Sequence, residues 1–168
     1  EIRTPMNAIM GLTHLALRDP EISAEQHERL DKVANAAQHL LSIINDILDF
    51  SKIEAGKLLL ENTDFSLGHV LSTVCGQIAE RADAKRLPVS YEIDPKLPAL
   101  LRGDPLRIQQ VLHNFLVNAV KFTERGSIRL AAHLLRQDQD GLHVRFAVHD
   151  TGIGMTPEVG SRLFAPFE

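Results

Sequence analysis

Hydrophobic residues recur at helical spacing through the first 56 residues of the chain. Between Leu30 and Leu48 they follow one another at intervals of three and four residues, which is the pattern of a buried helical stripe. A first helix is expected from Glu1 to about Arg18, with a local kink at Pro5 because proline removes an amide donor from a helix interior. Asp19 to Ile22 is the expected turn, so this part of the chain is predicted to be a helical hairpin.

The start of the second helix is marked by Ser23 and Gln26, whose spacing is that of a capping box. Two helices alone cannot cover an apolar face as wide as the one that follows. Pairing with a second copy of the chain in a four-helix bundle is the economical way to bury it. Residues 1–56 are therefore expected to form a dimerisation domain of a homodimer.

Strand and helix patterns alternate over residues 57–168. Ser66 is placed to cap one helix, and Asp104 followed by Pro105 is placed to begin another that runs to Phe122. An Asp-Gly pair indicates a hairpin between the last two strands. Strands are expected at Leu58–Leu60, Val89–Ile93, Ile128–Leu135 and Leu142–Val148, and residues 94–101 are expected to be loop. The predicted fold class is α+β: the helical hairpin, then an α/β two-layer sandwich with much antiparallel sheet.

Composition excludes several classes of protein. The 168 residues include 18 Lys plus Arg and 22 Asp plus Glu, a net charge of −4, so no nucleic-acid partner is expected. With 44% apolar and 24% charged residues the chain can bury a core, and no apolar stretch reaches the length of about 20 residues that a membrane helix needs. Cys75 is the only cysteine, which fits a reducing compartment such as the cytoplasm, and the eight histidines form no HExxH motif, so no zinc site is expected.

The strongest local motif is Asp150-Thr151-Gly152-Ile153-Gly154-Met155, at the end of an apolar strand. Glycines let main-chain atoms approach a flat ligand, and a carboxylate at a strand end can accept a hydrogen bond from an exocyclic amine such as that of adenine. A tight turn after a strand explains the same residues equally well.

A second motif lies on the helix that ends at Phe122. Asn114, Asn118 and Lys121 share one face of it, since they are spaced by four and three residues. Amide oxygens are neutral ligands suited to Mg²⁺ whose charge is balanced by a triphosphate, and a lysine can meet the phosphates. A solvated polar stripe is the alternative, but asparagine is a poor residue for a helix interior, and its use twice favours a ligand role.

Taken in order, these motifs resemble a sensor histidine kinase of two-component signalling, over essentially the whole chain. Glu1–Asn7 resembles the residues just after the phospho-accepting histidine of the family's H box, and Asn114–Thr123 resembles its N box. Asp150–Met155 resembles its first glycine box, and Leu163–Phe167 resembles its F box. Residues 49–56 are most similar to the hybrid kinases, which carry receiver domains downstream. The resemblance implies a Bergerat-type ATP-binding fold for residues 57–168.

Two features of the family would lie outside the chain. The acceptor histidine would stand immediately before Glu1, and the second glycine-rich box would follow Glu168. The chain is therefore expected to be a fragment, cut at both ends, that does not autophosphorylate by itself. The resemblance further implies the cytoplasmic portion of an inner-membrane bacterial sensor kinase, with any membrane segment upstream.

The resemblance also implies site residues. ATP and Mg²⁺ are the implied cofactors, with Asn118 as metal ligand, Asn114 assisting and Lys121 contacting phosphate. Asp150 would read the adenine amine, and the remaining nucleotide-binding residues would be Gly152, Gly154, Phe122, Phe164 and Phe167. In the hairpin, Glu1 would act as general base on the acceptor histidine, and Thr4 would position water or the partner aspartate.

The expected function is that of a protein-histidine kinase, which autophosphorylates on histidine with Mg-ATP and passes the phosphoryl group to a receiver-domain aspartate of a response regulator, in cis or in trans. Two other readings stay open: a degenerate, dimeric ATP-binding scaffold, and an ATP hydrolase of the same nucleotide fold. The hairpin with its Glu-Ile-Arg-Thr-Pro opening speaks against the hydrolase.

Overall fold

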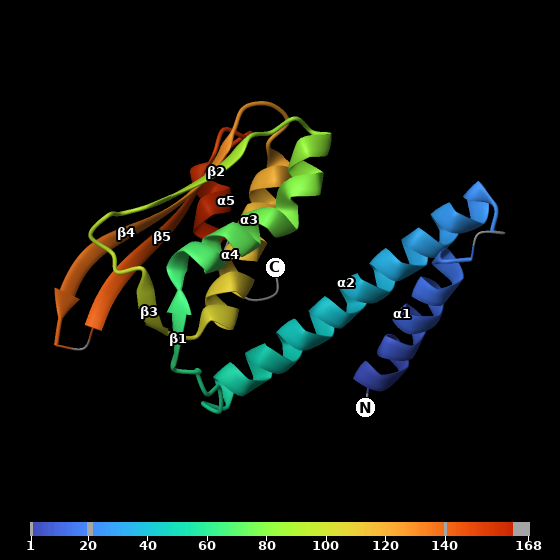
Figure 1. Cartoon of the computed structure of the whole chain (residues 1–168), viewed down its shortest axis with the longest axis horizontal. Helices are drawn as coiled ribbons and strands as arrows, with labels where there is room; N and C mark the ends of the chain where they lie inside the picture. The colour runs from blue at the N-terminus through green and yellow to red at the C-terminus, as the bar shows by residue number, and fades with distance from the viewer. Residues whose placement is uncertain (1, 20–21, 140, 163–168) are drawn as a thin grey trace. The chain divides into compact units, whose positions relative to one another are not determined.

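The computed structural model describes residues 2–19, 22–139 and 141–162. The chain divides into two compact units, Glu1–Leu59 and Leu60–Glu168, here called the hairpin unit and the sheet unit. The order of elements is two helices in the hairpin unit, followed by alternating strands and helices in the sheet unit (Figure 1). The predicted fold class is confirmed.

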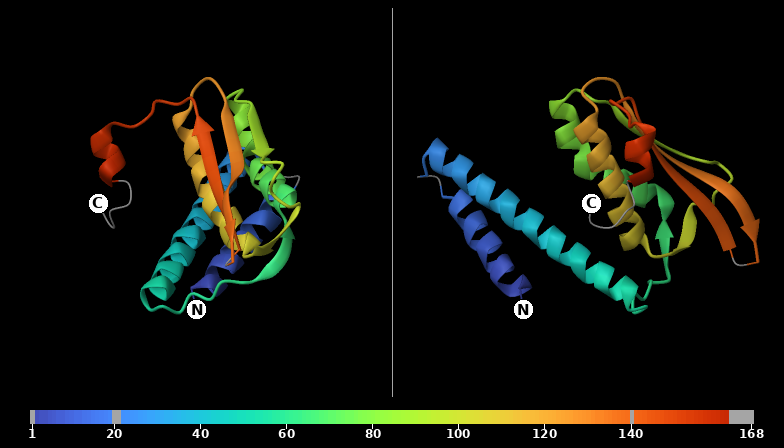
Figure 2. Two further views of the ribbon diagram at one scale, coloured as in Figure 1. Left: turned by 90° about the vertical axis from the view of Figure 1, so that its left-hand side faces the viewer. Right: turned by 180° about the vertical axis from the view of Figure 1, so that it is seen from behind.

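The hairpin unit consists of α1 (Arg3–Leu17) and α2 (Ala24–Glu54), two antiparallel helices that pack side by side (Figures 1 and 2). Helix α1 begins at Arg3, so Pro5 falls in the first turn. Amide groups of a first turn have no partner within the helix in any case. The reason for expecting a kink at Pro5 therefore does not apply, and that prediction is corrected.

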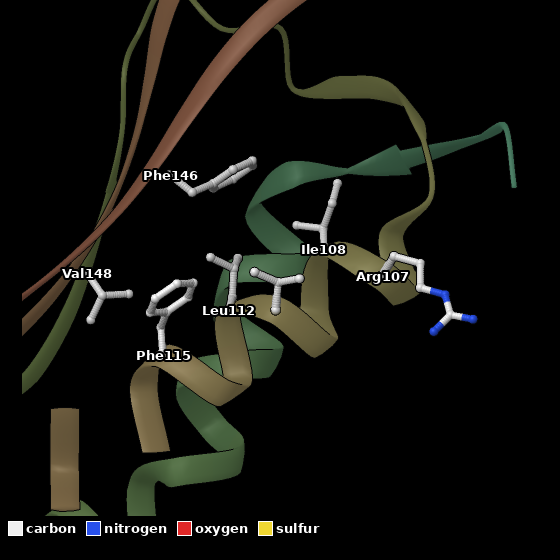
Figure 3. Close-up of a pocket in the computed structure, with 7 residues that line it drawn as sticks. Arg107, Ile108, Leu112, Phe115, Phe146 and Val148 are labelled. Atoms are coloured by element: carbon white, nitrogen blue, oxygen red, sulfur yellow. The ribbon is translucent and has the colours of Figure 1, made fainter. Parts of the chain in front are cut away.

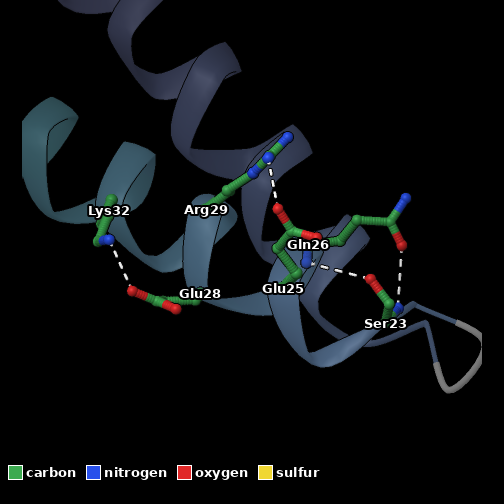
Figure 4. A network of polar contacts seen from close by, with 6 residues as sticks. All are labelled: Ser23, Glu25, Gln26, Glu28, Arg29 and Lys32. Carbon is green, nitrogen blue, oxygen red and sulfur yellow. Dashed lines mark hydrogen bonds and ion pairs between the residues drawn. The ribbon is translucent and has the colours of Figure 1, made fainter.

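The predicted capping box at the start of α2 is confirmed (Figure 4). Gln26 N donates to Ser23 Oγ at 3.2 Å, and Ser23 N donates to Gln26 Oε1 at 2.9 Å, so two amides at the helix end are satisfied reciprocally. The first turns also carry the exposed ion pairs Glu25–Arg29 and Glu28–Lys32. Pairs at this spacing add only a few tenths of a kcal/mol each.

Helix α2 keeps much of its apolar stripe uncovered in one copy of the hairpin. Ala37 is buried, with 6% of its surface exposed. Val33, Leu40 and Ile47, which follow one another at intervals of seven residues, are 46%, 47% and 57% exposed. Helix α1 is half as long as α2 and covers only part of this face.

The sheet unit contains two small sheets and two long helices. Its elements are β1 (Thr63–Ser66), α3 (Leu67–Ala84), β2 (Val89–Ile93), β3 (Leu100–Gly103), α4 (Pro105–Phe122), β4 (Ile128–Asp138), β5 (Gly141–Asp150) and α5 (Pro157–Arg162). Strands β1 and β3 pair antiparallel, and the second sheet has the order β2-β4-β5, parallel in its first pair and antiparallel in its second. Helices α3 and α4 lie together on one face of this sheet, which makes the two layers (Figure 2).

The core of the sheet unit lies between the two helices and the sheet. Its largest fully buried side chains come from both layers, among them Leu71, Ile78, Leu116, Ile128 and Leu130. The free Cys75 packs against this core, and burial raises the pKa of its thiol. Low thiolate content fits the small apolar role that its place on α3 indicates.

Two strand predictions are wrong. Leu58–Leu60 forms no strand; Leu59 and Leu60 are 89% and 67% exposed, and the strand begins three residues later, at Thr63. The predicted loop over residues 94–101 contains the start of β3. Both errors have one cause: β1 and β3 are short strands that exist by pairing with each other, with Phe65 opposite Leu101, and pairing across about 40 residues leaves no local pattern.

Candidate functional site

Helix α4 begins at the predicted cap. Asp104 Oδ1 accepts from Arg107 N at 3.0 Å, Asp104 Oδ2 accepts from Glu61 N at 3.1 Å, and Pro105 is the first helical residue. The hydrogen bond from Arg107 N, followed by that from Glu61 N, holds the pKa of the Asp104 carboxyl below its usual range. The cap fixes where the helix starts and so which side chains face the core.

One side of α4 is buried and another is exposed to solvent. Leu112, Leu116 and Ala119 are buried against the sheet and α3. Asn114, Asn118 and Lys121 are exposed on another side of the helix, together as predicted. The ammonium of Lys121 lies 5.0 Å from the ring centroid of Phe122, which is itself 46% exposed. The helix thus presents two amides, a cation and an aromatic ring to solvent near its C-terminal half.

The glycine motif is joined to the end of this helix. Asp150 Oδ1 accepts from Gly152 N at 2.9 Å, and Ile153 N donates to Phe122 O at 3.3 Å. A Cβ atom at Gly152 would lie 2.5 Å from Phe122 O, so only glycine allows this approach. The next glycine, Gly154, is exposed and has a φ of 68°. The tight turn is real, and it brings Asp150 to the helix that carries the asparagines.

A second set of contacts fixes the loop between α4 and β4. Thr151 Oγ1 accepts from Ser127 N at 3.0 Å and donates to Arg125 O at 3.3 Å. Gly126 has a φ of 121°, and a Cβ atom there would overlap the Thr151 hydroxyl. The motif starting at Asp150 is therefore held at both ends of this loop.

A cavity of about 410 Å³ opens between α4 and β5. It is lined by Arg107, Ile108, Val111, Leu112, Phe115, Phe146 and Val148. The apolar side chains converge on one space, while the guanidinium of Arg107 points away from them (Figure 3). Arg107 and Val111 precede Asn114 and Asn118 by seven residues, so the two asparagines lie further along the same side of α4 and are not among the residues that line the cavity.

The other predicted site residues are not brought to this place. Thr4 is exposed in the first turn of α1, in the hairpin unit. Glu1, Phe164 and Phe167 lie outside the described residues. Within residues 2–19, 22–139 and 141–162, no group of three His, Cys, Asp or Glu side chains is placed to hold a metal ion, and none of the helices combines the length and apolar character needed to span a bilayer.

Sequence reasoning missed three residues that build the site. Thr151 and Gly126 join the glycine motif to the loop after α4, and Lys85, the residue that follows α3, reaches the end of α4. Thr151 lies inside the predicted motif, so its position was available, but its partners were not. No local sequence pattern indicates Gly126 or Lys85, because their contacts are made only in the folded unit.

Comparison with known proteins places this geometry in a family. Residues 1–56 match the family of the His Kinase A (phospho-acceptor) domain, and residues 103–168 match the histidine kinase-, DNA gyrase B-, and HSP90-like ATPases. The sensor protein GacS of Pseudomonas syringae pv. syringae is 44% identical over 167 residues, or 99% of this chain. The chain belongs to the sensor histidine kinases.

Other relatives of this histidine kinase chain agree. The signal transduction histidine-protein kinase BarA of Escherichia coli (strain K12) is 40% identical over 99% of the chain. The hybrid signal transduction histidine kinase L of Dictyostelium discoideum is also 40% identical over 99% of it. The chain spans 18% of the length of GacS and BarA and 10% of the Dictyostelium protein.

Solved kinase structures share the fold of the two units. Full-length ShkA in complex with AMPPNP superposes with a TM-score of 0.71 at 34% identity, covering 94% of this chain and 33% of that one. The histidine kinase ThkA, solved with the response regulator protein TrrA, gives a TM-score of 0.63 at 26% identity, covering 99% of this chain and 47% of that one. A helical hairpin followed by a sheet domain is thus found in solved histidine kinases.

Proposed function

We propose that this chain is the dimerisation and ATP-binding part of a hybrid sensor kinase. In the reaction, a nitrogen of a neutral imidazole forms a bond to the γ-phosphorus of ATP while the bond from that phosphorus to the bridging oxygen breaks and ADP leaves. A receiver-domain aspartate of a response regulator then takes the phosphoryl group from the histidine. One observation carries the proposal: the Ile153 N to Phe122 O hydrogen bond joins the glycine motif to the helix with the two asparagines.

The end of β5 fits an adenine ring. Within the part of the chain that the structure describes, Gly152 N is the donor to the Asp150 carboxylate and uses Oδ1, which leaves Oδ2 for an exocyclic amine. Gly152 brings main chain close to this carboxylate, and the exposed ring of Phe122 offers an apolar face nearby. The solved ShkA complex with AMPPNP, an ATP analogue, supports a nucleotide at this kind of site.

The polar side of α4 fits a metal bound to phosphate. Asn114 and Asn118 are one helical turn apart and exposed, so both amide oxygens can reach one ion. Magnesium is usually held by one or two protein ligands and by the phosphates of its nucleotide, which suits a neutral pair of amides. Mg²⁺ would offset the charge that develops on the phosphates, and Lys121, on the same face, would meet their oxygens.

The hairpin unit fits the phospho-acceptor part of the reaction. The acceptor histidine is predicted immediately before Glu1, which would hold its second ring nitrogen and act as general base. Thr4 would then lie one turn along α1 from the acceptor, and its side chain is exposed, as a residue that meets water or a partner aspartate must be. The uncovered stripe of α2 supports a homodimer in which the two hairpins form a four-helix bundle.

The full-length protein, incubated with Mg²⁺ and ATP labelled in the γ-phosphate, tests the proposal. Phosphohistidine is labile in acid and stable in base, so a protein-bound label with that behaviour is the expected result. A degenerate scaffold would bind ATP and gain no label. An ATP hydrolase would release phosphate steadily with no phosphoprotein. Either of these two results would overturn the proposal that the protein is a histidine kinase.

A further inference from the structure

Lys85 reaches from the end of α3 to the end of α4. Its Nζ lies 3.0 Å from Val120 O, 3.2 Å from Lys121 O and 3.3 Å from Thr123 O. The side chain is 32% exposed, so most of its stem is covered. An ammonium has three hydrogens to donate and no acceptor, and here three main-chain carbonyls surround it.

Two of these carbonyls, those of Val120 and Lys121, are ones that a helix cannot satisfy by itself. The last four C=O groups of a helix have no partner within it, and together they form the negative end of its dipole. Lys85 Nζ donates to the carbonyls of Val120 and Lys121, which are the third and second residues from the end of α4 when Phe122 is counted as the last. The fourth contact, to Glu124 Oε1 at 3.1 Å, joins a carboxylate that is 80% exposed, where an ion pair contributes little.

The carbonyl between these contacts holds the glycine motif. Phe122 O lies between the Lys121 and Thr123 carbonyls along the chain, and it accepts from Ile153 N. The main chain at Gly152 also approaches this oxygen closely, since a Cβ atom there would lie 2.5 Å from it. The end of α4 is thus held from one side by Lys85 and from the other by the turn that follows Asp150.

The backbone at Lys85 is itself fixed, so its side chain starts from a defined point. Arg86, the next residue, has a φ of 56°, in the left-handed region that ends many helices. Leu87 then donates from its N to Ala82 O at 2.9 Å and is 1% exposed in the core. A buried leucine and a closed turn anchor the residue whose ammonium caps the neighbouring helix.

We propose that Lys85 is a positioning residue of the nucleotide site. It does not contact the nucleotide. It neutralises the partial negative charge at the end of α4 and so fixes the position of Phe122 O, and with it the position of the turn that carries Asp150. The inference rests on the proposed function, because the turn matters for catalysis only if a nucleotide binds there. Sequence motifs of the site contain no hint of this residue, which lies 29 residues before Asn114.

The test compares Lys85→Met with Lys85→Arg and Glu124→Gln in the full-length protein. Methionine keeps the apolar stem and removes the charge. We expect the Kd for ATP and the KM of autophosphorylation to rise roughly tenfold, with kcat within about twofold of wild type. The reason is that the variant loses binding energy that the ground state and the transition state share. Arginine also donates to several carbonyls, so Lys85→Arg should recover most of the affinity. Glu124→Gln removes only the exposed ion pair and should bind ATP as wild type does.

Hydrogen exchange supplies the second measurement. In Lys85→Met the amide of Ile153 and those after the end of α4 should exchange faster, while residues 129–133 of β4 stay protected. An ATP affinity within twofold of wild type would overturn the proposal, as would faster exchange throughout the sheet unit, which would mark Lys85 as merely structural. If Lys85→Met does not fold, Lys85→Gln decides by the same two criteria. Wild-type protein that binds no ATP would refute the proposed function instead, a result that no Lys85 variant can produce.

Discussion

Asn118 is the side chain for which a neutral oxygen matters most. If it ligates Mg²⁺ beside the phosphates, Asn118→Asp adds a negative charge next to the triphosphate and changes the geometry of the metal shell. We expect autophosphorylation of the full-length protein to fall by roughly tenfold or more, most strongly at low Mg²⁺. The measurement is initial rate against Mg²⁺ concentration. Asn35→Asp, on the exposed side of α2, makes the same charge change and should leave the rate unchanged; equal rates in both variants would remove the metal role.

His113 sits one residue before the first of the two asparagines, with its Nδ1 buried and, among the described residues, without a hydrogen-bond partner. Burial, and then the charge of Arg81, lowers the pKa of this imidazole below its ordinary 6.5. The unfolded chain therefore binds the proton more readily than the folded one, so the neutral histidine's contribution to stability is complete above pH 6.5 and is lost as the pH falls from there toward the folded pKa.

We therefore expect His113→Leu to gain stability relative to wild type as the pH is lowered below 6.5, by less than about 1.4 kcal/mol per pH unit, the limit for one proton. Urea unfolding between about pH 5 and pH 8 measures the difference. Arg81→Gln removes the second cause of the shift and should make the gain smaller. A difference between His113→Leu and wild type that does not change with pH would show that this histidine is not held neutral.

At the scale of elements, the start of α4 depends on one carboxylate. Asp104→Ala removes the cap and should destabilise the protein by about 1 kcal/mol at neutral pH. The pKa of Asp104 lies below its ordinary 3.8, so the charged cap stabilises the fold above that value, and this stability is lost as the pH falls through the lower, folded pKa. Unfolding in urea at about pH 7 and about pH 3 should show the variant and wild type converging in acid. Glu80→Ala, an exposed change on α3, is the control; a constant gap for Asp104→Ala would contradict the argument.

The elements that the sequence predicted well are those with local signals. The capping pairs at Ser23 and Asp104 fix the starts of α2 and α4, and the helical period alone puts Asn114 and Asn118 on one face. The approach of Gly152 to Phe122 O, by contrast, joins two segments 30 residues apart, and only packing of the sheet against α4 brings them together. Half of the candidate site was thus predictable from helix chemistry, and the other half is tertiary structure.

At the scale of the whole molecule, the open question is what covers α2. Val33, Leu40 and Ile47 repeat every seven residues, the spacing at which helices pair lengthwise, and all three are exposed in a single hairpin. Helix α2 has 31 residues and α1 only 15, so α1 cannot cover the whole row. A homodimer that buries the row would explain why α2 carries it. These side chains are 46%, 47% and 57% exposed in one hairpin, so a substitution there should affect the dimer more than the hairpin itself.

Leu40→Glu should therefore separate the dimer without unfolding the hairpin. A carboxylate buried without a partner in a helix interface costs about 3 kcal/mol or more, which corresponds to a dimer weakened by more than about a hundredfold. Sedimentation equilibrium of the full-length protein gives the association constant, and circular dichroism checks the helix content. Asn35→Glu places the same charge on the polar side of α2 and should leave the dimer intact. If Leu40→Glu remains as dimeric as the control, the row of Val33, Leu40 and Ile47 is not the seam, and the phosphoryl transfer would need a different arrangement of the two hairpins.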